Sequence, residues 1–162
     1  MYNDSKSGPG ERRTAVPVTL LVAEDDPDDR ALIREALQEC CDIDRLHFVS
    51  DGEELMNYLR GREDYADRRA NPLPRLILLD LKMPKKDGFD VLAEIRGDPK
   101  LRSIPVVVLS TSRSEADVVR SYELGVSSYV SKPHTFHELV KAMRALVQYW
   151  FDVVSLAPVA TA

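Results

Sequence analysis

Residues 76–84 read Leu-Ile-Leu-Leu-Asp-Leu-Lys-Met-Pro, so a run of large apolar residues ends abruptly in a carboxylate, Asp80. Pro84 follows closely, and proline has no amide hydrogen to donate inside a strand. An apolar run of this length between breakers indicates a strand buried on both faces, which requires a parallel sheet covered by helices. Ligands bind at the carboxyl ends of such strands. Asp80 is therefore predicted to lie at the functional edge of the sheet.

Three further short strands are predicted to end in polar side chains of the kinds that bind a cation or a phosphoryl group. They are residues 18–23, which run into Glu24, Asp25 and Asp26; residues 105–109, which run into Ser110 and Thr111; and residues 128–131, which run into Lys132 and Pro133. The carboxyl ends of parallel strands meet at one edge of a sheet. We therefore expect an acid pair, a lone aspartate, a hydroxyl and a lysine at that edge.

Helix signals separate the predicted strands. Asp26 stands directly before Pro27 and further acids, which favours a role for Asp26 as a helix N-cap over a direct role in metal binding. Ser50 with Glu53, and Thr135 with Glu138, have the spacing of capping boxes. A further strand is predicted near residues 45–49, directly before Ser50. Strand and helix thus alternate five times, and this alternation predicts an α/β fold with a parallel sheet covered by helices on both faces.

Composition restricts the class of protein. The chain has 162 residues and a net charge of −5, which fits one folded domain and argues against general affinity for nucleic acid. No apolar stretch approaches the ~20 residues of a membrane helix, and no signal peptide is expected at the start. We expect a cytoplasmic protein with a disordered tail over 1–16, a folded domain over 17–154 and a flexible tail over 155–162. Cys40 and Cys41 form neither a disulfide framework nor a metal motif.

The ordered set of strand-end residues resembles the receiver domain of two-component response regulators, over roughly residues 17–150. The resemblance implies a flavodoxin-like, doubly wound sheet of five parallel strands in the order 2-1-3-4-5, with five helices. The implied roles are Glu24 and Asp25 as the metal-binding acid pair, Asp80 as the phosphoacceptor, Ser110 as the switch hydroxyl, Tyr129 as the switch aromatic and Lys132 as the phosphate-pairing lysine. The resemblance also implies that the backbone carbonyl of Lys82 binds the metal and that the Lys132–Pro133 peptide is cis.

The chemistry of a receiver suits these residue types. Crowded carboxylates raise one another's pKa, so Glu24, Asp25 and Asp80 together favour a divalent cation. Mg²⁺ fits, because it binds through a few carboxylates and keeps several waters. With Mg²⁺ and Lys132 holding charge on the transferring oxygens, Asp80 is expected to attack the phosphorus of a phosphohistidine. The expected phosphodonor is a sensor histidine kinase.

The sequence disfavours two other classes of protein. An aspartyl-phosphate phosphatase of the haloacid dehalogenase type needs a second acid two residues after its nucleophile, and Lys82 stands there. No phosphate-binding glycine loop is present, and no Gly-x-Ser-x-Gly elbow surrounds Ser110. An interaction module without phosphorylation is disfavoured because every site position is filled. A regulator acting through protein contacts and a phosphorelay intermediate both stay open, as does the downstream partner.

The polar connection over residues 60–75 contains Pro72 and Pro74 and is longer than usual between a helix and a strand. It is either an insertion that faces a partner or an extended, mobile end of the preceding helix. This connection resembles the small regulators associated with phytochrome-type sensor kinases, as do the stretches 84–88 and 104–112. A kinase of the phytochrome type is therefore the expected partner.

The last predicted helix is apolar over an unusually wide arc. One stripe should pack on the sheet, and a second stripe lies beside it. The first consists of Phe136, Val140, Met143, Val147, Trp150 and Val154, and the second of Leu139, Ala142, Leu146, Tyr149 and Val153. An exposed apolar face usually marks an interface, so we expect a homodimer through the C-terminal helix. The alternative is that the 60–75 connection or the 155–162 tail covers the second stripe.

Overall fold

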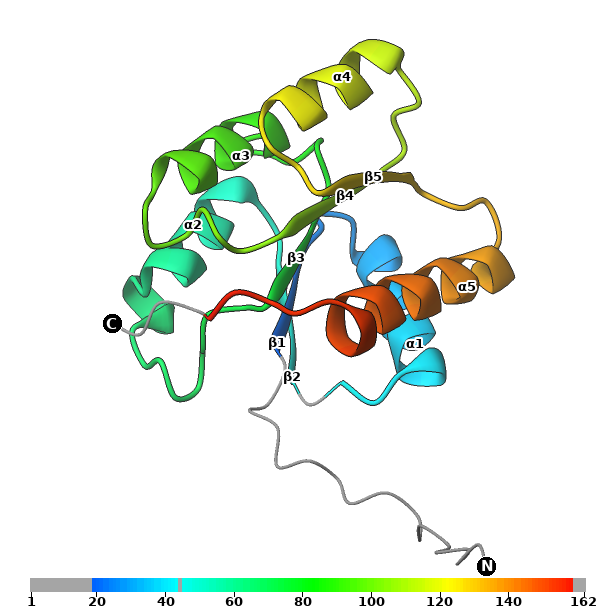
Figure 1. Ribbon diagram of the computed structural model, residues 1–162, viewed down its shortest axis with the longest axis horizontal. Helices are drawn as coiled ribbons and strands as arrows, with labels where there is room; N and C mark the ends of the chain where they lie inside the picture. Colours follow the sequence, from blue (N-terminus) through cyan, green and yellow to red (C-terminus); the bar gives the residue numbers. More distant parts are fainter. Residues whose placement is uncertain (1–18, 44, 159–162) are drawn as a thin grey trace, which may run out of the picture.

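A computed structural model describes residues 19–43 and 45–158 of the chain. Within them, strands and helices alternate along the chain (Figure 1). The elements are β1 (Thr19–Ala23), α1 (Pro27–Cys40), β2 (Arg45–Val49), α2 (Gly52–Arg60), the 3₁₀ helix η1 (Glu63–Tyr65), β3 (Leu76–Leu79), α3 (Gly88–Gly97), β4 (Val106–Ser110), α4 (Glu115–Glu123), β5 (Ser128–Ser131), α5 (Phe136–Val147) and the π-helix η2 (Gln148–Val153).

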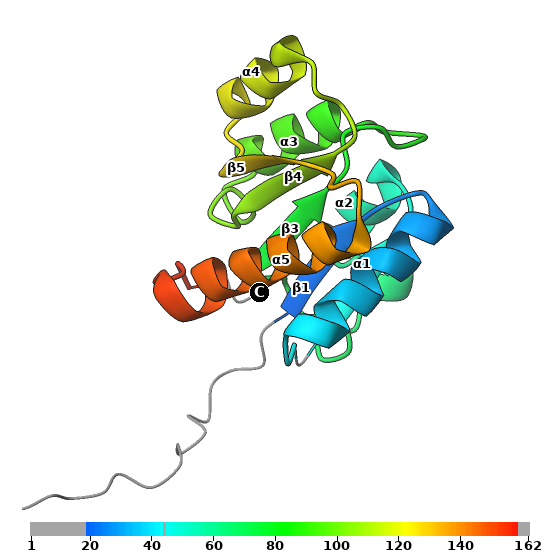
Figure 2. The same ribbon diagram turned by 90° about the vertical axis from the view of Figure 1, so that its right-hand side faces the viewer.

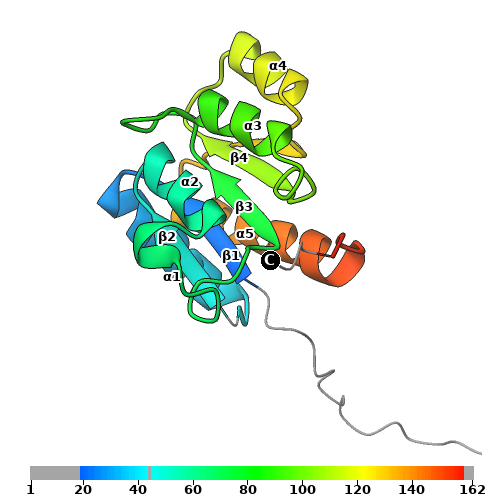
Figure 3. The ribbon, with the colours of Figure 1, turned by 90° about the vertical axis from the view of Figure 1, so that its left-hand side faces the viewer.

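The strands form one parallel sheet in the order β2-β1-β3-β4-β5, which confirms the predicted doubly wound fold. Helices α1 and α5 lie side by side on one face of the sheet (Figure 2). Helices α2, α3 and α4 lie on the other face (Figure 3). Because β1 and β3 are neighbours and their following helices cross to opposite faces, a crevice opens at their carboxyl ends. The fold therefore places the ends of β1 and β3 at the expected ligand edge.

The central strands are buried on both faces, as their continuous apolar sequences predict. Every residue of β1, β3 and β4 is buried. Side chains alternate between two cores, because successive residues of a strand point to opposite faces. Leu21 and Ile77 pack with α2 and α3, whereas Leu20 and Leu78 pack with α1 and α5. Two cores hold the sheet rigidly between the helix layers.

Two of the predicted helix starts are confirmed. The side chain of Asp26 accepts hydrogen bonds from the backbone N–H groups of Asp28 and Asp29, with Pro27 at the first helical position. The Thr135 hydroxyl accepts the N–H of Glu138 at 3.1 Å. These caps fix where α1 and α5 begin relative to the strands before them.

The predicted capping box of Ser50 and Glu53 is wrong by one residue. Asp51 is the N-cap of α2, and its Oδ1 accepts the N–H of Glu54 at 2.8 Å. The Glu54 carboxylate in turn accepts the N–H of Ser50 at 2.8 Å. The Ser50 hydroxyl accepts instead from the Arg30 guanidinium at 2.8 Å. A long-range contact thus takes the side chain that the local pattern assigned to the cap.

The long connection after α2 folds back onto that helix. Gly61, with φ of 64°, ends α2 in the left-handed conformation. The Arg68 guanidinium then donates to the carbonyls of Tyr58 at 2.7 Å and Leu59 at 2.5 Å. The Tyr65 ring packs against the Tyr58 ring at 4.9 Å between centroids. The connection is therefore a packed cap on the C-terminal end of α2 and not a continuation of the helix.

The C-terminal region leaves part of the second apolar stripe uncovered. Leu139 is buried, but Tyr149 is 52% exposed and Val153 is 71% exposed. Residues 155–157 lie instead beside Trp150. There they line a hollow together with residues of the segments that precede β4 and β5. The predicted 1–16 tail and residues 159–162 lie outside the described residues. Among the helices that the structure describes, none is long and apolar enough to cross a membrane.

Candidate functional site

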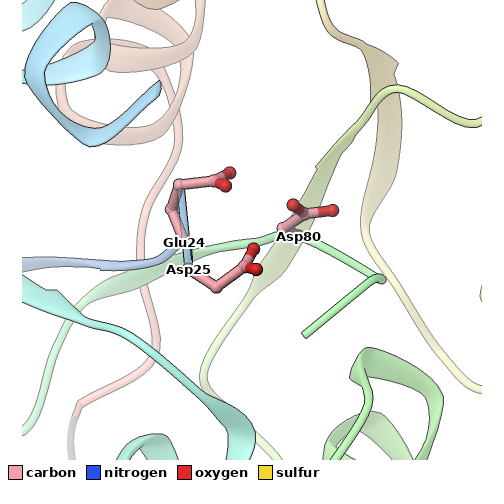
Figure 4. A group of neighbouring side chains, drawn as sticks. All are labelled: Glu24, Asp25 and Asp80. Carbon is pink, nitrogen blue, oxygen red and sulfur yellow. The ribbon is translucent and has the colours of Figure 1, made fainter. Parts of the chain in front are cut away.

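The carboxyl ends of β1 and β3 bring three carboxylates together. Ala23 pairs with Leu79 in the parallel register, so Glu24 and Asp25 meet Asp80 directly beyond it. Their carboxylate oxygens lie within 4.8 Å of one another and turn toward a shared space (Figure 4). We call Glu24, Asp25 and Asp80 the acid site. The sequence prediction that these residues converge is confirmed.

Burial differs among the three acids. Glu24 is 2% exposed and Asp80 is 7% exposed, whereas Asp25 faces solvent. The pKa of Glu24 is raised to about 7, because burial and the nearby charge of Asp80 together outweigh the hydrogen bond to Lys132, which lowers it. A divalent cation entering from the Asp25 side would relieve this repulsion between carboxylates. Hard oxygen donors of this kind fit Mg²⁺.

Lys132 reaches the acid site from the end of β5. Its backbone N–H donates to the Ser110 carbonyl at 2.8 Å, which extends the pairing of β4 and β5. Its Nζ lies 2.7 Å from Glu24 Oε2, 2.9 Å from Asp29 Oδ2 and 3.4 Å from Asp80 Oδ2. Burial lowers the pKa of Lys132, but the hydrogen bonds to Glu24 and Asp29 and the charge of Asp80 outweigh burial and raise it. The ammonium therefore stays charged beside Asp80.

The predicted cis peptide between Lys132 and Pro133 is wrong, since no peptide bond among the described residues is cis. The trans isomer is favoured before proline by about 0.5–1 kcal/mol. The flexible side chain of Lys132 reaches the acid site without a cis bond, so nothing in this geometry offsets that preference. The predicted aim of the ammonium is nevertheless confirmed.

Two residues of α1 take part in the site in ways that the sequence did not reveal. Asp29, expected only as a first-turn acid, pairs with Lys132. The Arg30 guanidinium donates to the backbone carbonyls of Glu24 at 3.1 Å and Asp25 at 3.4 Å. Arg30 thus fixes the backbone that carries the acid pair. The one available signal was that α1 begins directly at the site, so its first turn lies beside it.

The loop after β3 closes tightly over Asp80. The Lys82 N–H donates to Asp80 Oδ1 at 3.2 Å and orients the carboxylate. A Cβ on Gly88 would lie 2.7 Å from the Leu81 Cα and 2.9 Å from the Asp80 carbonyl, so this close approach requires glycine. Metal binding by the Lys82 carbonyl stays a prediction.

Asp26 caps α1, and its N–H donates to Glu24 Oε1 at 3.2 Å.

Ser110 and Tyr129 are joined through Ser112. Ser110 is fully buried at the end of β4, and its hydroxyl accepts the N–H of Ser112 at 3.2 Å. Tyr129, on the edge strand β5, donates its hydroxyl to the Ser112 carbonyl at 2.7 Å. The Tyr122 hydroxyl of α4 accepts the N–H of Tyr129 at 3.2 Å. Movement of the loop after β4 would therefore disturb both residues.

Comparison with known proteins decides the family. The response regulator receiver domain family is matched over residues 20–144. The chain is a response regulator receiver. The receiver is 41% identical to the response regulator Rcp1 of Synechocystis over 140 residues, which cover 86% of this chain and 93% of Rcp1.

Solved structures agree with this assignment. The receiver superposes on the phosphorylated cyanobacterial phytochrome response regulator RcpA with a TM-score of 0.82 and 40% identity, covering 88% of this chain and 100% of RcpA. It matches the Mn²⁺-bound form of Rcp1 with a TM-score of 0.79 and 40% identity, over 88% of this chain and 100% of Rcp1. The bacteriophytochrome response regulator RtBRR matches with a TM-score of 0.71 and 40% identity, over 88% of this chain and 86% of RtBRR. The receiver therefore shares its fold with metal-binding, phosphorylated regulators.

Proposed function

We propose that the receiver accepts a phosphoryl group on Asp80, with Mg²⁺ held by Glu24, Asp25, Asp80 and the Lys82 carbonyl. The observation that carries this proposal is the position of Asp80. Asp80 belongs to the acid site and directly follows β3; its Oδ1 accepts the Lys82 N–H at 3.2 Å, and its Oδ2 lies 3.4 Å from the Lys132 ammonium. A nucleophile so placed has positive charge available on both sides of the incoming phosphoryl group.

The transfer needs few parts from the protein. A carboxylate oxygen of Asp80 forms a bond to phosphorus as the bond from phosphorus to the donor imidazole breaks, and the imidazole leaves with the electron pair. Bound Mg²⁺ would supply charge to the transferring oxygens. Lys132 supplies a second positive charge, and the Lys82 N–H orients the Asp80 carboxylate. Loss of the phosphoryl group to water at the same site is part of the proposal.

The proposed phosphodonor is the phosphohistidine of a phytochrome-type sensor kinase in the cytoplasm. Support comes from the similar structures, which are described as phytochrome and bacteriophytochrome response regulators. The phosphoryl group is then read through contacts with another protein, or is passed on in a relay. An aspartyl-phosphate phosphatase is not favoured, because the Lys82 side chain occupies the place of the required second acid.

Ser110 and Tyr129 are the proposed switch. A phosphoryl group on Asp80 would draw the Ser110 hydroxyl toward it as a donor, and this would remove the acceptor of the Ser112 N–H. The loop after β4 would then shift, and the bond from Tyr129 to the Ser112 carbonyl would break. Tyr129 would turn inward, and the face made by α4 and α5 would change shape.

A homodimer through α5 and η2 is the proposed assembly. Tyr149 and Val153 stay exposed, and the described part of the C-terminal tail lies on the Trp150 side. Sedimentation at micromolar concentration should show a dimer that weakens in Tyr149→Glu or Val153→Glu. Val119→Glu on α4, where Val119 is 48% exposed, is the matched control. A monomer at every concentration, with and without beryllofluoride, would contradict the proposal.

Labelling of Asp80 tests the central proposal. Wild-type receiver treated with acetyl phosphate and Mg²⁺ should gain one phosphoryl group by intact mass, and Asp80→Asn should gain none. Asp51→Asn is the matched control, because Asp51 is also buried, also follows a strand end and caps α2. Stoichiometric labelling of Asp80→Asn would overturn the assignment.

A further inference from the structure

The three carboxylate partners of Lys132 are not equivalent. Glu24 and Asp80 belong to the acid site, so both would share their oxygens with a bound cation. Asp29 also contacts the Lys132 Nζ, at 2.9 Å, but it lies outside the group of carboxylates that converge on one point in the described part of the chain. Asp29 is therefore the one acidic partner of Lys132 that a cation in the acid site leaves free.

A cation in the acid site would oppose the present arrangement of Lys132. The nearest partner of the ammonium is Glu24 Oε2, at 2.7 Å. A divalent ion would draw electron density from Glu24 and Asp80 and repel the ammonium, because like charges repel strongly at short range. Without a further anchor, Lys132 would lose its hold on the site at the stage when the phosphoryl group needs it.

The position of Asp29 suits an anchor. It lies in the first turn of α1, where its N–H donates to Asp26 Oδ1. Helix α1 is held against the sheet by Ile33, Ala36 and Leu37, all buried. The Asp29 side chain is 35% exposed, so solvent weakens its pairing with Lys132, but the Lys132 side chain is only 12% exposed. Helix α1 thus presents a carboxylate to the largely covered Lys132 side chain.

We propose that Asp29 is a positioning residue, which keeps the Lys132 ammonium beside Asp80 while a divalent cation occupies the oxygens of Glu24 and Asp80. The effect of Asp29 on labelling rests on the proposed phosphorylation of Asp80, whereas the placement of Lys132 by Asp29 does not. Asp29 acts through Lys132 and needs no contact with the phosphoryl group.

A structure with the metal alone tests the geometry without any activity. In crystals of the wild-type receiver grown with Mg²⁺, the Lys132 Nζ should stay within hydrogen-bond distance of Asp29. The distance from the Nζ to the Glu24 carboxylate should increase. In Asp29→Ala crystals with Mg²⁺, the ammonium should move away from Asp80. A Lys132 side chain that abandons Asp29 in the Mg²⁺-bound wild type would overturn the proposal.

A double-mutant cycle tests the consequence. Asp29→Ala should slow labelling by acetyl phosphate at saturating Mg²⁺ about tenfold, the loss expected for one hydrogen bond to a charged group. Asp28→Ala is the control. Asp28 also lies in the first turn of α1, and its N–H also donates to Asp26 Oδ1, but its side chain is exposed. Asp29→Glu should recover part of the rate. In a Lys132→Ala background, Asp29→Ala should have no further effect.

The outcomes separate the two proposals. An equal loss from Asp29→Ala with and without Lys132 would show that Asp29 does not act through the lysine and would overturn the inference. Wild-type rates for Asp29→Ala would overturn it as well. Circular dichroism of each variant checks folding, and Asp29→Asn serves as a second variant if Asp29→Ala unfolds. If the wild-type receiver is not labelled at all, the proposed function fails. The Mg²⁺-bound crystals still test whether Asp29 holds the Lys132 ammonium.

Discussion

Two groups of acidic residues lie beside the carboxyl edge of the sheet, and they differ in what their oxygens contact. The first is the acid site of Glu24, Asp25 and Asp80. The second lines a hollow between α2 and η1, which we call the α2 hollow; its residues are Asp51, Glu53, Glu54, Asn57, Glu63, Asp64, Tyr65 and Lys85. Both groups are rich in negative charge, so charge alone does not separate them.

In the α2 hollow, carboxylate oxygens are taken up by local donors. Asp51 Oδ1 accepts the N–H of Glu54, and its Oδ2 lies 3.5 Å from the Lys85 ammonium. The two oxygens of Glu54 accept the N–H of Ser50 at 2.8 Å and the hydroxyl of Tyr65 at 2.5 Å. These acids stabilise the start of a helix and the connection packed on it.

In the acid site, oxygens from two strand ends face one another across a shared space, and a lysine from a third strand joins them. Burial, and to a lesser extent the charge of Asp80, raise the pKa of Glu24. Convergence of oxygens on one point, and not the number of acids, therefore distinguishes a cation site from other acidic surfaces.

The largest effect on phosphorylation is expected from Asp25→Asn. It removes the exposed carboxylate of the acid site, and labelling of Asp80 at fixed Mg²⁺ should fall by roughly a hundredfold or more, the upper range for disturbing groups around a metal. Thermal stability should stay the same or rise, since a repelling charge is lost. Asp64→Asn in the α2 hollow should leave labelling unchanged; an equal loss there would erase the distinction.

Asp51→Ala should have an intermediate effect, and it should change stability while leaving labelling intact, the reverse of Asp25→Asn. Loss of an N-cap should lower the free energy of unfolding by about 1 kcal/mol, and up to about 2 kcal/mol. Urea unfolding measures this change, and Mg²⁺-dependent labelling of Asp80 should persist at the wild-type rate. If Asp51→Ala abolishes labelling while folded, the α2 hollow takes part in phosphorylation.

The smallest effect concerns Tyr65. Burial, and then the hydrogen bond to Glu54, raise the pKa of its hydroxyl. A raised pKa means that the unfolded chain ionises first, so the contribution of Tyr65 to stability is complete below pH ~10 and falls above it. Tyr65→Phe should therefore flatten the alkaline loss of stability, with a change of up to about 1 kcal/mol. Unfolding midpoints at pH 8 and pH 10.5 provide the measurement, and parallel pH profiles for the two proteins would refute it.

Much of the acid site could be predicted because its residues follow long apolar strands. The run before Asp80 fits only a buried strand, and its partner before Glu24 fits the same description, so the shared edge followed from simple packing. The contact of Asp29 with Lys132 could not be predicted in this way. It joins residues 103 positions apart, and its existence depends on the direction in which the first turn of α1 faces.

Local patterns failed where a distant group intervened. The Ser50 hydroxyl binds Arg30, so the cap of α2 falls to Asp51. The connection after α2 gave no periodic signal, and its order comes from Arg68, which caps the carbonyl end of α2 from ten residues away. Sequence patterns report neighbours along a helix or a strand, and these contacts join segments that only the tertiary fold brings together.

Anomalous diffraction from crystals with Mn²⁺ and beryllofluoride tests the central claim most directly. We expect one strong metal peak between Glu24, Asp25 and Asp80, with beryllofluoride attached to the Asp80 carboxylate and Lys132 beside it. A metal peak in the α2 hollow with an empty acid site, or beryllofluoride on a residue other than Asp80, would contradict it.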